Sequence, residues 1–592
     1  MPSPTISHPA SGDPAARLQA LEACIADLEA ALWDAGPNKA LLADYQAAFR
    51  ELEELLAVHG GAGRRHRIVI VIPVADSPRQ LAACLDSLLT QCRSYAYGGL
   101  RNGRFAKVAV LLADDSMQAD SIARNREILR NLDRQGIDTH YFGAEEQRAL
   151  MQRVHSLELD GIVGVHPGQA FAHKGQAMMR NIAYLKLAEM RARMPGERLL
   201  FYTIDADQRF QVRVSTASGG RDLYAVNYLY HLDRIFDDSG VQVVTGKVVG
   251  DPPVSPAVMA VNFLDDVIAF VSEMAASEPM QAYRQPGADT RGCAEAAYHD
   301  MADMFGFRAD EQAYRYRCRI AGTPDNGACF DEFCERLDSF FHGEHPTRIT
   351  WYRYQAVDES LQPARTVYTG NYVFSAEALD WFIPFAPLRL RMSGPTMGRL
   401  LRSAIGDRFV SANLPMLHQR TLDTTGQSEF RPGVVAEREQ IDLGDEFERQ
   451  FFGDVMLFAI ERLATRGFPE RPQPEALVRH TLDRVYEEMR EKYRARQGLV
   501  RERLERLRRL LGDEQRWWNR SPAYARALAA IDTFVENLEH NFAADSALGR
   551  WLASADAWPA WRERQLAAIR SLDTDRQHWR RAMQIINGLD RE

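Results

Sequence analysis

The feature that most constrains this chain is RIVIVIPVA, residues 67–75, where an unbroken run of apolar, mostly β-branched residues follows one arginine. A strand that is buried on one face alternates apolar and polar side chains, whereas a strand buried on both faces is apolar throughout. Strands of the second kind occur mainly in parallel sheets that have helices on both faces. The run therefore predicts a central strand of an α/β domain.

The residues that follow repeat the order of strand and helix. Helical spacing runs through residues 77–92, 120–136 and 175–196, and apolar strands are expected at 107–116 and 198–204. Alternation of this kind is typical of βαβ units. We expect a mainly parallel sheet.

Acidic residues follow three of these strands: Asp76 the first, Asp114 and Asp115 the second, and Asp205 and Asp207 the third. Ligands of parallel sheets bind at the carboxyl ends of the strands. Residues i and i+2 of an extended segment point the same way, so Asp205 and Asp207 can converge on one cation such as Mg²⁺ or Mn²⁺. The alternative is a solvated strand end.

Helical patterns flank the α/β domain. Two apolar stripes separated by Gly36-Pro37 predict a helical hairpin, which either packs on its own domain or contacts a second subunit as a short coiled coil. The expected divisions are a disordered tail at 1–14, the hairpin at 15–60, an α/β domain at 67–425 with an insertion or lid at about 275–365, and an α-helical C-terminal domain at 430–592.

Composition limits the partners and the location. The net charge of −9, from 72 Lys and Arg against 81 Asp and Glu, gives no reason to expect a nucleic-acid partner. Seven Cys in 592 residues indicate reduced thiols rather than a disulfide scaffold. Neither a signal peptide nor a membrane span is evident, so we expect a cytoplasmic protein. Cys329, Cys334, His342 and His345 lie close in sequence but fit no standard zinc spacing.

In combination, these segments resemble the nucleotide-sugar glycosyltransferases of the GT-A fold, especially the family-2-like enzymes. The matching segments, in chain order, are VIVIPVADSPRQLAACLDSLL, VLLADDS, HKGQAMMRNIAY, FYTIDADQRF, VVTGKVVGDPP, YTGNYVFS and PMLHQR. They cover roughly residues 67–275 and 366–420. The resemblance implies a Rossmann-like catalytic domain that moves a sugar from a UDP- or GDP-sugar to a hydroxyl acceptor with Mn²⁺ or Mg²⁺.

The resemblance also implies roles for individual residues. The expected metal ligands are Asp205, Asp207 and His418, and the expected donor-binding residues are Pro73, Asp76, Asp114, Asp115, Lys174, Arg180 and Asp205. A divalent cation would neutralise the diphosphate leaving group, and the two basic residues would add positive charge. Each residue also has an ordinary alternative, as a surface cation, a helix cap or a packed histidine.

One departure from the family bears on the mechanism. Inverting members usually carry a Glu-Asp pair late in the domain that deprotonates the acceptor, but RLRMSGPTMGRLLR, in the 388–402 region, has no acid. Either another acid such as Asp251 or Glu273 serves, or the enzyme retains configuration and reads the acceptor through small residues at 393–396. We favour the retaining outcome. The candidate catalytic residues are Asp207, Asp251, Ser393 and Thr396.

Two other functions are compatible with the sequence. A nucleotidyltransferase also uses an α/β sheet and paired acids, but PVADSPRQ lacks the Gly-rich basic loop that it would need. A degenerate transferase domain that acts as a scaffold would bind neither metal nor nucleotide. For the transferase, we expect a small soluble or saccharide acceptor, and a homodimer formed through the helical regions is an open alternative to a monomer.

Overall fold

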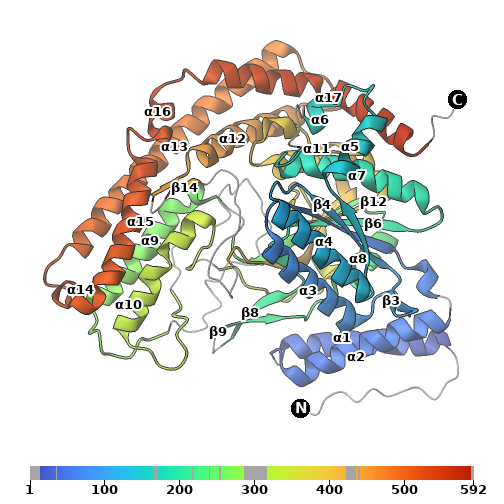
Figure 1. Ribbon diagram of the computed structural model, residues 1–592, viewed down its shortest axis with the longest axis horizontal. Coiled ribbons are helices and arrows are strands. Elements are labelled where there is room, and N and C mark those ends of the chain that lie inside the picture. The colour runs from blue at the N-terminus through green and yellow to red at the C-terminus, as the bar shows by residue number, and fades with distance from the viewer. Residues whose placement is uncertain are drawn as a thin grey trace.

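A computed structural model gives the fold (Figure 1). It describes residues 14–34, 36–59, 61–164, 171–216, 219–238, 240–252, 255–285, 316–347, 349–421, 435–437 and 440–588. Residues 1–13 of the predicted tail, the middle of the predicted insertion and the predicted domain boundary near 425–430 lie outside these residues, and Pro14, the last residue of the predicted tail, begins a helix.

The centre of the molecule is a mixed α/β domain whose main sheet, within the described residues, has nine strands. Eight follow the order β11-β13-β10-β12-β6-β1-β4-β5, and β7 pairs with β13. The strands are β1 (Arg67–Val74), β4 (Val108–Asp114), β5 (Asp138–Phe142), β6 (Leu199–Ile204), β7 (Gln208–Arg209), β10 (Val243–Gly250), β11 (Gln362–Pro363), β12 (Asn371–Ser375) and β13 (Phe409–His418).

The strand directions bring distant segments to one edge of the sheet. Strands β5, β4, β1 and β6 are parallel, and β12 is antiparallel to both β6 and β10. Strand β13 is parallel to β10, so β10 and β13 run in the same direction as β1. The carboxyl ends of β1, β4, β6, β10 and β13 therefore share one edge, which we call the carboxyl edge.

Both faces of β1 are buried, as the apolar run predicts. Ile68, Ile70 and Ile72 belong to one apolar core, and Val69 and Val71 belong to the other. Helices α3 (Pro78–Tyr95), α4 (Ala119–Arg134) and α8 (Tyr228–Asp238) contribute to the first core, and α7 (Gln176–Arg193) contributes to the second.

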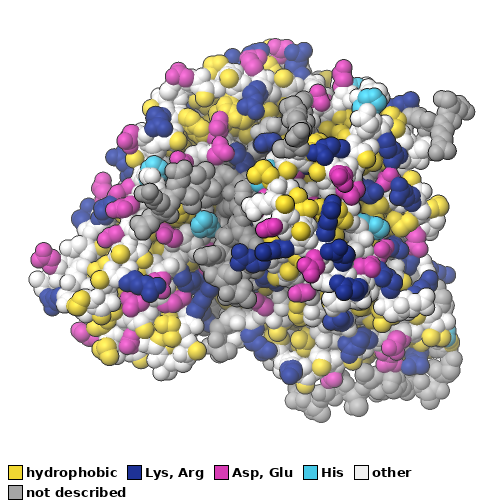
Figure 2. Space-filling model, in the orientation of Figure 1, with side chains coloured by type: hydrophobic (Ala, Val, Ile, Leu, Met, Phe, Trp, Pro, Cys, Tyr) yellow, Lys and Arg dark blue, Asp and Glu magenta, His cyan; other side chains and the backbone are white. Residues whose placement is uncertain are grey.

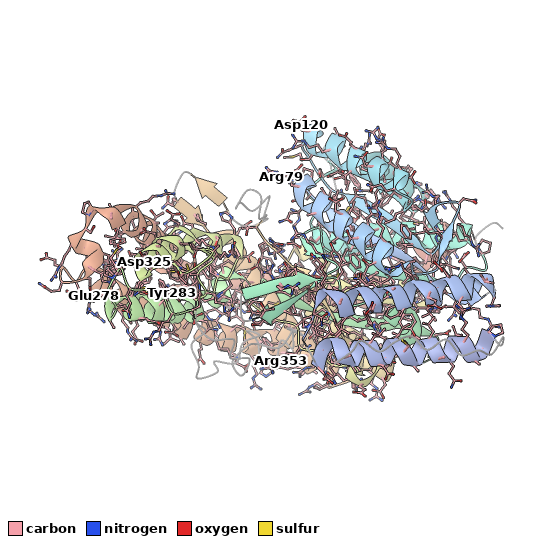
Figure 3. All side chains as sticks on the ribbon, turned by 90° about the horizontal axis from the view of Figure 1, so that it is seen from below. Arg79, Asp120, Glu278, Tyr283, Asp325 and Arg353 are labelled. Carbon is pink, nitrogen blue, oxygen red and sulfur yellow. The ribbon has the colours of Figure 1, made fainter. Side chains whose placement is uncertain are left out.

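Helices α1 (Pro14–Asp34) and α2 (Lys39–Val58) lie where the sequence predicts a hairpin, and they run side by side in the view from below (Figure 3). Asn38 caps α2 by accepting from the backbone N–H groups of residues 40 and 41. Tyr45 and Phe49 of α2 pack edge-on against Tyr95 of α3. The hairpin thus packs on its own α/β domain, the first of the two predicted arrangements.

A second body of helices arches around the sheet (Figure 1), and we call it the helical lobe. It consists of α9 (Pro256–Ala275), α10 (Asn326–Glu335), η4 (Leu337–His342), α12 (Gly444–Ala464), α13 (Glu475–Leu511), α14 (Trp517–Arg520), α15 (Ala525–Phe542), α16 (Ala547–Ala553) and α17 (Trp558–Ile586). Part of the predicted insertion packs into this lobe, since Phe330 of α10 stacks on Trp518 of α14 at 5.2 Å between ring centroids. Its last described part joins the sheet instead, where Thr350 bridges to Gly250 and β11 pairs with β13. Figure 3 labels Glu278, Tyr283 and Asp325 in this lobe.

The remaining elements are short or join the two bodies. They are β2 (Leu100–Arg101), β3 (Arg104–Phe105), α5 (Ala144–Arg153), α6 (Asp160–Val163), β8 (Val212–Thr216), β9 (Gly219–Leu223), α11 (Ser393–Ile405), β14 (Val435–Glu437) and β15 (Gln440–Asp442), with short 3-10 turns between them. Among the described helices, none combines the length and the apolar character that crossing a bilayer requires.

Candidate active site

The carboxyl edge collects most of the predicted site residues because five strands end there in the same direction. Asp76 follows β1, Asp205 and Asp207 follow β6, and Asp251 follows β10. His418 is the last residue of β13. Helices α3 and α4 begin at this edge, and Figure 2 shows Lys and Arg side chains over them, interspersed with Asp and Glu.

Asp207 and His418 meet at this edge. Asp207 Oδ2 lies 3.4 Å from His418 Nε2 and accepts a hydrogen bond of 2.6 Å from the Arg420 guanidinium. Burial alone would raise the pKa of Asp207, but Arg420 and His418 outweigh it and hold that pKa well below its usual range. Asp207 therefore stays ionised.

The hydrogen bond of His418 Nδ1 orients the other ring nitrogen, Nε2. His418 Nδ1 lies 2.7 Å from the backbone oxygen of Asp251, so Nδ1 carries the proton and donates it. Nε2 then faces the carboxylate of Asp207, and a histidine that binds a metal is usually oriented in this way, by a hydrogen bond from its other ring nitrogen. Asp207 Oδ1 is buried and accepts no hydrogen bond from the residues that the structure describes. These donors suit a hard divalent cation.

Asp205, the third predicted metal ligand, is paired differently. Its carboxylate forms an ion pair with Arg180 of α7, which is almost fully buried. A Cβ at position 370 would lie 2.7 Å from Asp205 Oδ2, so Gly370 leaves room for this carboxylate. In the described part of the chain, no three His, Cys, Asp or Glu side chains are gathered as a metal site. The two carboxylates are instead neutralised by two arginines.

Asp76 bonds within the protein. Its carboxylate accepts from the backbone N–H groups of Met117 at 3.2 Å and Gln118 at 3.0 Å, and it pairs with His173 Nε2 at 2.6 Å. Burial opposes ionisation of Asp76, but these bonds outweigh it and lower its pKa. Asp76 thus ties the ends of β1 and β4 to the segment before α7.

Asp114 also has partners from the protein. It accepts from the backbone N–H of Ser116 at 2.9 Å, from Asn125 at 3.1 Å and from the Tyr141 hydroxyl at 3.0 Å. A nucleobase would have to share this carboxylate with those donors.

Asp115 and Lys174 form a buried ion pair of 2.5 Å. Burial raises the pKa of Asp115 despite Lys174, and burial lowers the pKa of Lys174 despite Asp115. Pro73 lies inside β1, opposite Ala113 of β4, so its contribution to the edge is through the backbone.

The predicted acceptor segment begins a helix rather than a loop. Helix α11 starts at Ser393, and Thr396 is buried within its first turn. A Cβ on Gly394 would lie 2.5 Å from the backbone oxygen of Val367, so α11 packs closely against the segment that leads to Gly370. The helix forms because Leu400 and Leu401 bury its apolar side. Glu273 is exposed on α9 and follows no strand.

Two residues of the candidate site, Arg420 and Glu344, were not predicted from the sequence. Arg420 stands two residues after His418, and that spacing on a strand end was the available signal. The carboxylate of Glu344 accepts a 2.5 Å hydrogen bond from the hydroxyl of Thr421, the residue after Arg420. Glu344 comes from the predicted insertion, where periodicity gave no indication of position.

Comparisons with known proteins give little. No protein-family model matches the chain, and no curated protein matches it. Among solved structures, the chain is similar to a mannosyltransferase from Pyrobaculum calidifontis in complex with GDP-Man and Mn²⁺, at 11% identity and a TM-score of 0.29, over 95% of this chain and 100% of that one. Similarity at that level does not establish a family, so the function has to be argued from the site.

Proposed function

We propose that the protein is a metal-dependent glycosyltransferase of the GT-A type, family-2-like, which moves a sugar from a nucleotide-diphosphate sugar to a hydroxyl acceptor. One observation carries the proposal. Asp207, from the strand predicted to bind metal, lies against His418, although 210 residues separate the two in the chain. The resemblance drawn from sequence assigns both to the same metal.

The available donors define what this edge can hold. Asp207 and His418 would hold Mn²⁺ or Mg²⁺, and Asp205, which is paired with Arg180 in the structure, is the candidate third ligand. The bound cation supplies Lewis acidity that neutralises the diphosphate leaving group.

Two arginines at the carboxyl edge are candidates for binding the diphosphate of the donor. Arg180 and Arg420 form ion pairs with the two carboxylates, Asp205 and Asp207, that would hold the metal. A guanidinium binds phosphate in the same bidentate manner as carboxylate. Both arginines are therefore placed to bind the diphosphate once a cation occupies the carboxylates. Lys174, beside Asp115, adds charge to the same edge.

Retention of configuration is the favoured outcome. The first turn of α11 contains no acid, and Gly394 in it lets the turn pack closely against the segment that ends at Gly370. Asp251 is the carboxylate that would serve as a base in the inverting alternative, since it lies at the same edge. The acceptor class that we propose is a small soluble molecule or a saccharide.

Thermal unfolding with UDP, GDP and their sugars, with and without Mn²⁺, tests the proposal. A ligand that binds only the folded state raises the unfolding temperature. We expect one nucleotide to stabilise the protein only with Mn²⁺, and Asp207→Asn to abolish that effect. Asp556→Asn, an exposed change on the helical lobe, is the matched control. The absence of any shift in the wild type would contradict the proposal and favour a scaffold.

A further inference from the structure

Glu344 belongs to the helical lobe, although its carboxylate lies at the carboxyl edge. The backbone of its segment is fixed by the lobe: Glu344 N–H donates to the Ser339 oxygen at 3.1 Å, and the ring of Phe340 stacks on Phe263 of α9 at 4.6 Å. Three residues later, Thr347 Oγ1 donates to Asp266 at 2.6 Å. The position of Glu344 is therefore set by the lobe rather than by the sheet.

The Glu344 carboxylate joins the lobe to the end of β13. Oε1 pairs with Arg319 at 3.1 Å and with Arg336, and Oε2 accepts from Thr421 Oγ1 at 2.5 Å. The residue is 4% exposed. Burial opposes its ionisation, but Arg336 and the Thr421 hydroxyl outweigh burial and lower the pKa of Glu344. Glu344 thus presents a charged, fixed acceptor to Thr421.

Thr421 directly follows the residues that make the site. The Arg420 backbone N–H donates to Asp251 Oδ2 at 2.8 Å, and the Arg420 guanidinium binds Asp207. The Gln419 N–H donates to the backbone oxygen of Asp207 at 3.0 Å. Residues 418–420 are therefore held from the sheet side by two aspartates, and Thr421 is held from the lobe side by Glu344.

We propose that Glu344 is a positioning residue which, through Thr421, fixes His418 and Arg420 for binding of the cation and the nucleotide diphosphate. The inference rests on the proposed function. Residues that orient metal ligands from outside the first layer commonly change metal affinity by about 10–100-fold when they are lost. The helical lobe thus helps to fix the side chains of His418 and Arg420 at the carboxyl edge, through Glu344 and Thr421.

Thr421→Val separates this role from general stability because it removes one hydroxyl and leaves the Glu344–arginine pairs in place. Thr481→Val is the control, since it removes a buried hydroxyl that donates to the Leu477 backbone oxygen at 2.7 Å within α13 and is not among the contacts that fix Glu344. Thr421→Ser keeps the hydroxyl and is the rescue variant. Mn²⁺ affinity is measured for each full-length protein by electron paramagnetic resonance, with UDP or GDP present, beside the unfolding temperature.

We expect Thr421→Val to weaken Mn²⁺ binding about tenfold, while Thr421→Ser and Thr481→Val stay within about twofold of the wild type. Equal Mn²⁺ affinity in Thr421→Val and Thr481→Val, with a wild type that binds Mn²⁺, overturns the positioning role alone. A wild type that binds no Mn²⁺ overturns the proposed function as well.

Discussion

Asp454 offers a quantitative test of the packing in the helical lobe. It lies on α12, is fully buried, and accepts from Gln450 Nε2 at 2.8 Å and from the Tyr493 hydroxyl at 2.6 Å. Burial outweighs these two bonds and raises the pKa of Asp454 from 3.8 to about 6. When the pKa of a carboxyl is higher in the folded state than in the unfolded chain, ionising that carboxyl lowers the free energy of unfolding.

The sign and size of the effect follow from these values. Below about pH 4, Asp454 is protonated in both the folded and the unfolded protein, so its burial does not lower the free energy of unfolding. Between about pH 4 and pH 6, the folded protein holds a proton that the unfolded chain has lost, so the free energy of unfolding falls as the pH rises. A shift of about two pKa units corresponds to about 3 kcal/mol, and that penalty is complete above about pH 6.

Asp454→Asn is neutral at every pH, and its amide can still bond Gln450 and Tyr493. We expect the variant to be more stable than the wild type by up to about 3 kcal/mol at pH 7.5, with the difference vanishing near pH 4. Urea unfolding at several pH values measures this, with the exposed Asp556→Asn as control. A variant that is less stable than the wild type at pH 7.5, or a difference that does not change with pH, would refute the reasoning.

Three further substitutions test separate parts of the structure. Arg65→Met should destabilise by about 3–5 kcal/mol in urea unfolding, because Arg65 is the buried partner of Glu53 at 2.9 Å and Asp233 at 2.7 Å; a loss below about 1 kcal/mol would show that the three charges are not coupled. Gly498→Ala should stabilise by about 0.5–1 kcal/mol, because nothing crowds this position inside α13, and a loss of stability would argue against a continuous helix. Gly370→Ala should weaken Mn²⁺ binding about tenfold without unfolding the protein, and unchanged binding would place the metal elsewhere.

The parallel part of the sheet, β5-β4-β1-β6, was predictable because local signals and the global fold agree there, whereas the antiparallel pairings of β12, β11 and β7 make the whole sheet mixed rather than mainly parallel. The apolar run at 67–75 needs two covered faces, and β1 has a core on each. Gly36-Pro37 separates α1 from α2 because that pair interrupts helical geometry. A chain whose patterns coincide with its tertiary contacts can be interpreted from sequence.

The candidate site was only partly predictable. Asp207 and His418 follow from strand ends and from the resemblance, but their contact depends on β10 and β13 pairing in parallel across a long stretch of chain. The pairing of Asp205 with Arg180 depends on how α7 lies against β6, which no spacing encodes. Glu344 reaches the edge through the fold of the lobe, so its role required three-dimensional coordinates.

The most direct test of the central claim is the Mn²⁺ stoichiometry and affinity of the full-length protein, measured by electron paramagnetic resonance with UDP or GDP present. Asp207→Asn and His418→Gln are compared with the wild type, and unfolding in metal-free buffer confirms that each variant is folded. The account predicts one tightly bound Mn²⁺ per chain in the wild type, which is lost in both variants. Equal Mn²⁺ binding in the folded variants, or none in the wild type, would contradict it.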